Sequence, residues 1–407
     1  MRLPAHGARL ARSGARRAAT RTGCGDTTPE RGQSAVVSSL REALWRAAAN
    51  RRAGLPRTSS LPPAEVDDAV QAVLRRAFEH LWEHGWLPYD VFEMVRREED
   101  ERALSFLVDS LALEAGRYSA LHPRWQEQLE EIEATIWWDV TQPHVDQWAS
   151  RHIELREDGV AAAVAVLGVL ITLPGLPEIV PKPGTPLSAI DHHHVDPKIL
   201  NRVRGLLAKA ESTAFPEEAE ALSTKAQELV TRHALERMPL EAATTTSRRL
   251  WLDKRYFDGK AQVVHVVAEA NRCRAVVYDL GFVALVGEEL DLEIVELLSA
   301  SLLVQATRAM IAAGEKARKG DEARSAVFRK SFLLSYAHRI GERLRTANEV
   351  PADDDRLLPV LAARKKAVEE YFGTMFTRTV SKSTPVRSAA GWDAGRSAAD
   401  RANLSIT

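Results

Sequence analysis

The 407-residue chain contains only two cysteines, Cys24 and Cys273. Two cysteines so far apart do not form a disulfide framework, so we expect a reducing compartment and a cytoplasmic location. Long apolar runs are absent as well, because the longest, Val160 to Leu173, has only fourteen residues. A run of that length is too short to span a bilayer and is typical of a buried helix. We therefore expect no association with a membrane.

Familiar catalytic signatures are also missing. The sequence has no phosphate-binding GxxxxGKS or GxxxxGKT loop and no GxGxxG, HExxH, CxxC or GxSxG pattern. These absences argue against the commonest nucleoside triphosphatases, zinc metalloproteases and dinucleotide-binding enzymes. An enzyme with an unfamiliar site stays an open alternative, and we expect no cofactor.

The formal net charge of -1 hides an uneven distribution. Residues 35–158 carry 23 acidic and 14 basic side chains, a net charge of -9. Three later segments are basic, with net charges of +3 for residues 197–260, +4 for 322–345 and +3 for 374–407. This asymmetry indicates an anionic partner for the second half, or attraction between the two halves.

The first half of the chain has helical periodicity. Residues 1–34 are rich in arginine and lack the apolar stretch of a secretory signal, so we expect a disordered tail, with a transit peptide as the alternative. Residues 35–172 form a predicted helical domain, whose first clear helix follows Pro62 and Pro63 and is ended by Gly85. Four more helices are expected at residues 89–98, 101–119, 124–138 and 156–172. Residues 173–196, rich in proline and histidine, are a predicted linker.

The second half is predicted to be mixed. Residues 197–240 have the pattern of an αα-hairpin, and residues 248–373 that of an α+β domain with a β-hairpin turning at Gly281. Residues 374–407 are expected to be a polar basic tail. The expected fold class is therefore mostly α with a small α+β C-terminal domain: a helical N-terminal domain, an αα-hairpin, and a β-hairpin packed among helices.

The αα-hairpin segment carries a family resemblance. Its signatures are KIL at 198–200, LLAKAEST at 206–213, PEEAEA at 216–221 and KAQEL at 225–229. In these residues the chain resembles the DUF2786 family, a domain of unknown function found in bacteria and phages. Residues 250–404 resemble the region that usually follows it, and the helical domain with HGWLPYD at 84–90 resembles actinobacterial versions. The resemblance implies a fold and brings no established activity.

Two histidine patterns raise the question of a metal. His80, Glu83 and His84 match the HxxEH pattern of inverted zincins, and His192, His193 and His194 form a run in the linker. A zinc helix continues past its second histidine, whereas Gly85 ends this one, and histidine at a helix C-terminus is favoured by the helix dipole. We therefore predict no metal site, and interpret the run of three as a solvated segment.

Basic stripes are the stronger candidates for a binding site. On the hairpin, Lys198, Arg202 and Lys209 share one helix face, which is either a solvated face or a ridge that contacts phosphate. The segment 324–348 places five side chains on one arc: Arg329, Phe332, Tyr336, Arg339 and Arg343. Arginines that alternate with aromatic rings can grip phosphates and stack on bases. The alternative is a half-buried helix whose arginines pair with carboxylates of the acidic N-terminal domain.

Three functional hypotheses remain open at this point. The first is a non-catalytic protein that binds DNA or RNA through these stripes. The second is an enzyme, such as a hydrolase, whose site the sequence does not reveal. The third is a helical interaction module that acts through self-association or interdomain contact.

Overall fold

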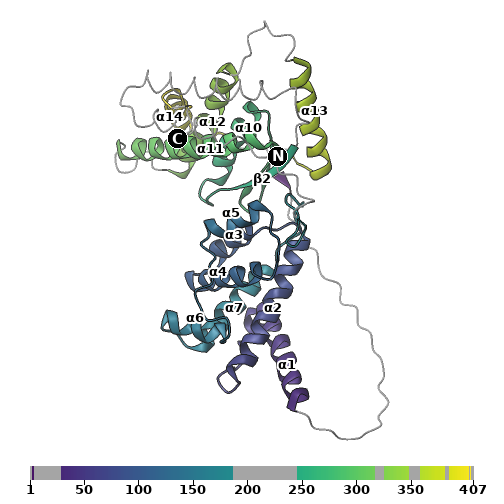
Figure 1. The fold of residues 1–407 in the computed structure, drawn as a ribbon. Helices are drawn as coiled ribbons and strands as arrows, with labels where there is room; N and C mark the ends of the chain where they lie inside the picture. The colour runs from purple at the N-terminus through teal and green to yellow at the C-terminus, as the bar shows by residue number, and fades with distance from the viewer. Residues whose placement is uncertain are drawn as a thin grey trace. The chain divides into compact units, whose positions relative to one another are not determined.

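The computed structural model describes residues 2–3, 29–186, 245–316, 325–347, 358–380, 385–402 and 404. The chain divides into two units, residues 6–191 and residues 1–5 together with 192–407, which are taken separately below (Figure 1). The described residues contain twelve α-helices and one small sheet in the C-terminal unit. The predicted fold class is thereby confirmed, although the αα-hairpin at 197–240 lies outside the described residues.

The described part of the N-terminal unit is helical throughout. Its helices are α1 (Pro29–Ala49), α2 (Pro63–Glu83), α3 (Pro88–Glu98), α4 (Glu101–Ala115), α5 (Pro123–Glu131), α6 (His144–His152) and α7 (Arg156–Leu170), with a 3-10 turn at Arg51–Ala53. Helix α1 begins inside the segment predicted to be a disordered tail. Helix α5 ends earlier than predicted, because Glu133 takes a left-handed conformation with φ 54° and the chain turns away. Helix α6 was not predicted.

Tryptophan packing holds these helices together. Trp86 and Trp148 are among the largest fully buried side chains, and the apolar run of α7 is buried as predicted. The Nε1 of Trp86 donates to the carbonyl oxygen of Pro174 at 2.8 Å, and Leu176 and Val180 are buried. The first part of the predicted linker therefore packs onto the helices and is not a solvent-exposed connection.

The sheet of the C-terminal unit has the strand order β1-β3-β4-β2. Strand β4 (Phe282–Glu288) is central and antiparallel to both β2 (Thr245–Trp251) and β3 (Arg274–Tyr278). The β3–β4 hairpin turns at Gly281 as predicted, where φ is 111° and a side chain would be strained. At the edge, β1 (Arg2–Leu3) pairs in parallel with β3. The first residues of the predicted disordered tail are therefore part of the sheet.

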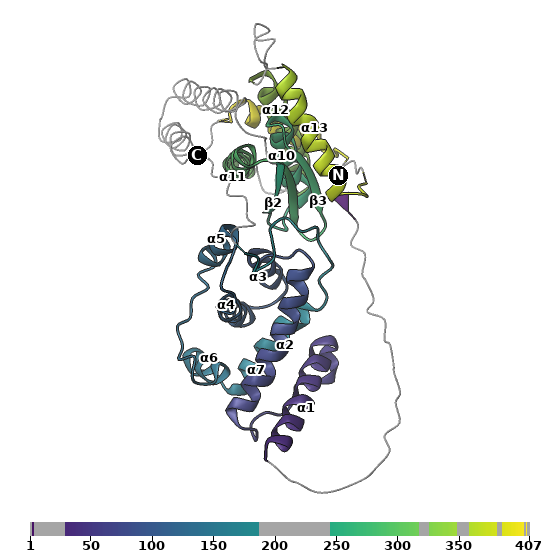
Figure 2. The same cartoon turned by 45° about the vertical axis from the view of Figure 1, so that its right-hand side comes forward.

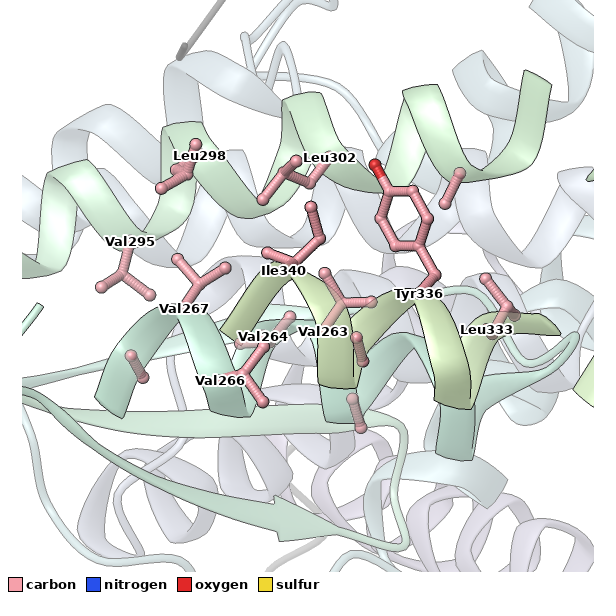
Figure 3. Packing of buried hydrophobic residues seen from close by; sticks show 14 of the residues in the cluster. Val263, Val264, Val266, Val267, Val295, Leu298, Leu302, Leu333, Tyr336 and Ile340 are labelled. Atoms are coloured by element: carbon pink, nitrogen blue, oxygen red, sulfur yellow. The ribbon is translucent and has the colours of Figure 1, made fainter. Parts of the chain in front are cut away.

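Helices pack on both sides of this sheet (Figure 2). Helices α10 (Phe257–Ala270) and α11 (Glu289–Lys316) pack on the face that carries Val277, Val283 and Leu285, and α12 (Ala326–Ala347) lies against α10. The opposite face carries Tyr278, whose ring contacts Phe376 just after α13 (Leu358–Met375). Figure 3 shows the core between α10, α11 and α12, where side chains such as Val263, Leu302 and Ile340 interdigitate.

Helix α11 is also the one helix among the described residues that is long and apolar enough to cross a membrane, over Glu289–Gly314. Of its most apolar stretch, 44% is buried in the protein. Its buried side chains Leu292, Leu298 and Leu302 belong to the core of the C-terminal unit. The sequence analysis, which considered only uninterrupted apolar runs, did not single it out.

The end of the chain differs from the prediction. Residues 374–407 were expected to be a polar basic tail, but they contain α14 (Ala389–Asp400), which packs along α12. Close contact is possible because Gly391 and Gly395 have no side chains: a Cβ on Gly391 would lie 2.5 Å from the carbonyl oxygen of Phe328, and one on Gly395 would meet that of Phe332. Buried alanines at positions 398 and 399 complete the interface.

Candidate functional site

The aromatic members of the predicted arginine–aromatic stripe are buried. Phe332 is 1% exposed and Tyr336 is not exposed, and both belong to the core of the C-terminal unit. Figure 3 shows the Tyr336 ring directed from α12 toward α11. The expectation that these rings stack on bases is therefore wrong for this structure, because stacking needs an exposed ring face. Burial also raises the pKa of the Tyr336 hydroxyl above its ordinary value.

Two arginines of the stripe hold α14 in place. Arg339 forms ion pairs with Glu342 at 2.8 Å and with Asp400 at 2.5 Å. The Nη1 of Arg343 donates to the carbonyl oxygens of Ala399, at 2.5 Å, and Ala402, at 2.7 Å. Arginine is well suited to bind the last carbonyl oxygens of a helix, which have no partner within the helix. These partners belong to the C-terminal unit, not to the acidic N-terminal domain that the sequence analysis considered.

The remaining stripe residue, Arg329, meets a tyrosine that the sequence analysis missed. The Nη1 of Arg329 donates to the hydroxyl oxygen of Tyr256, 3.4 Å away. The guanidinium of Arg255 lies 5.2 Å from the centroid of the same ring, close enough for its charge to act on the hydroxyl. We refer to Arg255, Tyr256 and Arg329 as the phenol–arginine cluster. Among the described residues neither arginine has a carboxylate partner, and the Nε of Arg329 is buried without a hydrogen-bond partner.

The two arginines act on the ionisation of the phenol. Burial raises the pKa of Tyr256, but the hydrogen bonds and positive charges of Arg329 and Arg255 lower it, and the net result is a pKa below the ordinary value of 10. The backbone of Tyr256 is left-handed, with φ 58° and ψ 32°, and this residue directly precedes α10. A bulky residue in that conformation is strained, and such strain is typical of sites under functional constraint.

Three helices begin near the cluster and run in the same direction. A Cβ on Gly259 of α10 would lie 2.7 Å from the Cβ of Leu333 on α12, and one on Gly341 of α12 would lie 3.1 Å from Val266 on α10. Position 259 thus pairs with 333, and 266 with 341, so α10 and α12 are parallel. Helix α14 is parallel to α12 by the same argument, since its glycines 391 and 395 meet residues 328 and 332.

The N-termini of these parallel helices therefore lie at the same end of the unit, with those of α10 and α12 beside the cluster, because Tyr256 precedes α10 and Arg329 lies in the first turn of α12. A helix N-terminus carries a partial positive charge of roughly half a unit, which favours anions. The first turns of α12 and α14 contain no acidic residue, while α10 has Asp258 in its first turn. The other carboxylate at this end, Asp253, pairs with Lys260 at 3.0 Å. Further basic residues lie near the N-termini of these helices: Lys254 before α10, Lys330 in α12 and Arg387 before α14.

The histidine patterns do not form a metal site in the described residues. The rings of His80 and His84 lie 4.1 Å apart, but the Nδ1 of His84 is 2.7 Å from the carbonyl oxygen of His80 in the same helix. Burial and the neighbouring His84 lower the pKa of His80. No group of three or more His, Cys, Asp or Glu side chains suited to a metal ion occurs in the part of the chain that the structure describes.

Other predicted residues are not placed. Lys198, Arg202, Lys209 and the run His192–His194 lie outside the described residues. Conversely, Arg255 and Tyr256 were missed, because they precede a helix and lie 73 residues from Arg329 along the chain. The available signal was the short run DKRYFDGK at 253–260, in which cations flank two aromatic residues.

The comparisons with known proteins agree with the resemblance found in the sequence. No curated protein and no solved structure matches the chain. One family model does, and its description is "Protein of unknown function (DUF2786)". The match covers residues 198–237, the segment whose signatures were quoted above. Residues 198–237 of this chain are thus identified as a DUF2786 segment.

Proposed function

We propose that this protein is a non-catalytic, nucleic-acid-associated binding protein that contacts phosphate through the phenol–arginine cluster. The observation that carries the proposal is the meeting of two guanidinium groups, Arg255 and Arg329, at one hydroxyl without a carboxylate partner among the described residues. Several other arginines of the unit pair with carboxylates, for example Arg339 with Asp400 and Arg272 with Asp291. An arginine pair that lacks such a partner is well suited to an external anion.

The surroundings of the cluster support the same proposal. The helix N-termini add positive potential, and the segments 197–260 and 322–345, which contain the residues of the cluster, have net charges of +3 and +4. A positive potential concentrated at one end of a domain attracts the phosphates of nucleic acids and is screened by salt. We further propose a cytoplasmic location, which suits the free, buried thiol of Cys273.

The test is a fluorescence-anisotropy titration of the full chain against single- and double-stranded DNA and RNA at several salt concentrations. We expect binding that weakens with salt, and we expect Arg329→Ala and Arg255→Ala each to lower the log–log salt slope by roughly one unit. The matched control is Arg345→Ala, which removes an exposed arginine from the opposite end of α12 and should leave the slope unchanged. Equal losses in all three variants would locate the binding elsewhere.

A protein-interaction module is the second candidate, favoured by exposed apolar side chains on the N-terminal unit. Ile153 is 95% and Leu155 69% exposed, in the connection between α6 and α7. Exposed apolar residues gathered in one connection are typical of contact surfaces. The measurement is the molar mass of the full chain by light scattering over a range of concentrations. A dimer that dissociates on Ile153→Asp supports self-association, and a monomer at every concentration excludes it.

A further inference from the structure

We propose that the phenol–arginine cluster binds a terminal phosphate, that is a phosphate monoester at a strand end or on a free nucleotide, in preference to the phosphodiesters within a strand. This inference rests on the proposed function, because it specifies which phosphate the same site takes. Three features of the C-terminal unit support it: the shape of the cationic surface, its charge, and the set of hydrogen-bond donors.

The first feature is that the two arginines of the cluster lie together in one place and are not spread along a groove. Proteins that bind the interior of a strand align cations and exposed rings along a groove, so that successive phosphates and bases are contacted. Helix α12 has the arginine spacing for such a track, but Arg339 and Arg343 are bound to α14 and Phe332 is buried. Only Arg329, at the start of the helix, remains directed at Tyr256. The surface thus contacts one phosphate group.

The second feature is the amount of positive charge at that point. Two guanidinium groups meet there at the N-termini of α10 and α12, and Asp258 is the one acidic residue in the first turns of these two helices. A phosphodiester carries a single negative charge, whereas a monoester carries about -1.5 to -2 at pH 7. The monoester therefore gains more from the same field, which favours a terminal phosphate.

The third feature is the donor set. Arg255 is exposed and presents a planar fork of N–H groups, and the hydroxyl of Tyr256 is a further donor beside it. A monoester has three terminal oxygens that accept charge-assisted hydrogen bonds, whereas a diester has two. Arg329, which donates to the same hydroxyl through its Nη1, adds further guanidinium N–H groups beside the phenol. The number of donors matches the group with more acceptors.

The experiment compares one oligonucleotide sequence with a 5′-phosphate, a 3′-phosphate or hydroxyl ends, all titrated against the full chain. Adenosine monophosphate and inorganic phosphate serve as competitors, to distinguish a strand end from a free ligand. We expect at least tenfold tighter binding of one phosphorylated form than of the hydroxyl form. Arg329→Ala should abolish this preference, while Arg345→Ala should retain it.

A spectroscopic readout accompanies the titration. A bound dianion beside Tyr256 disfavours the phenolate, so we expect the earliest tyrosinate absorbance in an alkaline titration to move to higher pH when adenosine monophosphate is added. Tyr256→Phe should remove this component of the spectrum. If Arg329→Ala does not fold, as judged by its thermal melt, the exposed Arg255→Ala variant takes its place in every arm.

The outcomes separate the two proposals. Equal affinity for phosphorylated and hydroxyl ends, with Arg329→Ala weakening both alike, would refute the terminal-phosphate inference and leave the proposed function standing. Binding of adenosine monophosphate that depends on Arg329, with no binding of any oligonucleotide, would support the inference and refute the nucleic-acid function. No binding of any of these probes would refute both.

Discussion

Gly259 of α10 and Leu333 of α12 meet so closely that a Cβ on the glycine would lie 2.7 Å from the Cβ of the leucine. This contact sets the two helices side by side and brings Tyr256, three residues before Gly259, to Arg329, four residues before Leu333. The candidate site therefore depends on a packing contact one turn away from it.

The contact predicts the effect of adding one methyl group. Gly259→Ala should lower the free energy of unfolding by about 1–3 kcal/mol, because the Cβ of Leu333 is fixed to the backbone and α12 must move. Gly373→Ala is the control, since Gly373 lies in α13 with nothing within 4 Å of an added Cβ. That variant should gain about 0.5–1 kcal/mol from helix propensity. Denaturant unfolding measures both changes, and a stabilised Gly259→Ala would contradict the packing described.

The bonds of Arg343 predict a role in stability. Arg343→Ala removes donors from the carbonyl oxygens of Ala399 and Ala402, so we expect a loss of about 1–2 kcal/mol and faster proteolytic cleavage near α14. Arg345→Ala, which removes an exposed arginine from the same turn, should change stability by less than about 0.5 kcal/mol. A stable Arg343→Ala variant with impaired nucleic-acid binding would instead make Arg343 a direct contact to the ligand.

The phenol–arginine cluster predicts the order in which the tyrosines ionise. The pKa of Tyr256 is lowered by its two arginines, whereas burial raises the pKa of Tyr89 to about 12 and that of Tyr278 to about 12. An alkaline titration followed at 295 nm should therefore begin below pH 10 with Tyr256. Tyr256→Phe should lack this first step, and Arg329→Ala should move it to higher pH. An unchanged first step in both variants would assign it to another tyrosine.

Ile153 combines strain with exposure. Its φ is 57°, a left-handed conformation that costs a β-branched residue roughly 1–2 kcal/mol, and its side chain is exposed. Ile153→Gly should relieve this strain, and after the entropic cost of glycine we expect a gain of up to about 1 kcal/mol in thermal or denaturant unfolding. Ile311→Gly is the control, because Ile311 is 52% exposed within α11 and has no left-handed strain to relieve, so it should only lose stability. A destabilised Ile153→Gly would show that Ile153 makes contacts in solution.

Much of the fold follows from local patterns in the sequence. The spacing of apolar residues predicted α2, α3, α4 and α7, because a helix that buries one face needs apolar residues every three to four positions. The turn at Gly281 followed from two β-branched runs around a glycine. Helix α14 was missed, because a short helix rich in alanine and glycine lacks that pattern and is stabilised by close packing on α12.

The candidate site depended more on tertiary structure than the helices and the β-hairpin did. A helical wheel shows that Phe332, Tyr336 and Arg339 share one side of α12, but it does not show what covers that side. The cover comes from α10 and α11, which precede α12 in the chain, and from α14, which follows it. These helices bury the rings and α14 binds the arginines. Likewise, Arg255 and Arg329 are adjacent only because α10 and α12 pack in parallel. The sequence by itself thus determined most of the helices, the hairpin and the DUF2786 segment, while only long-range packing decided which arginines of α12 bind α14 and which one meets Tyr256.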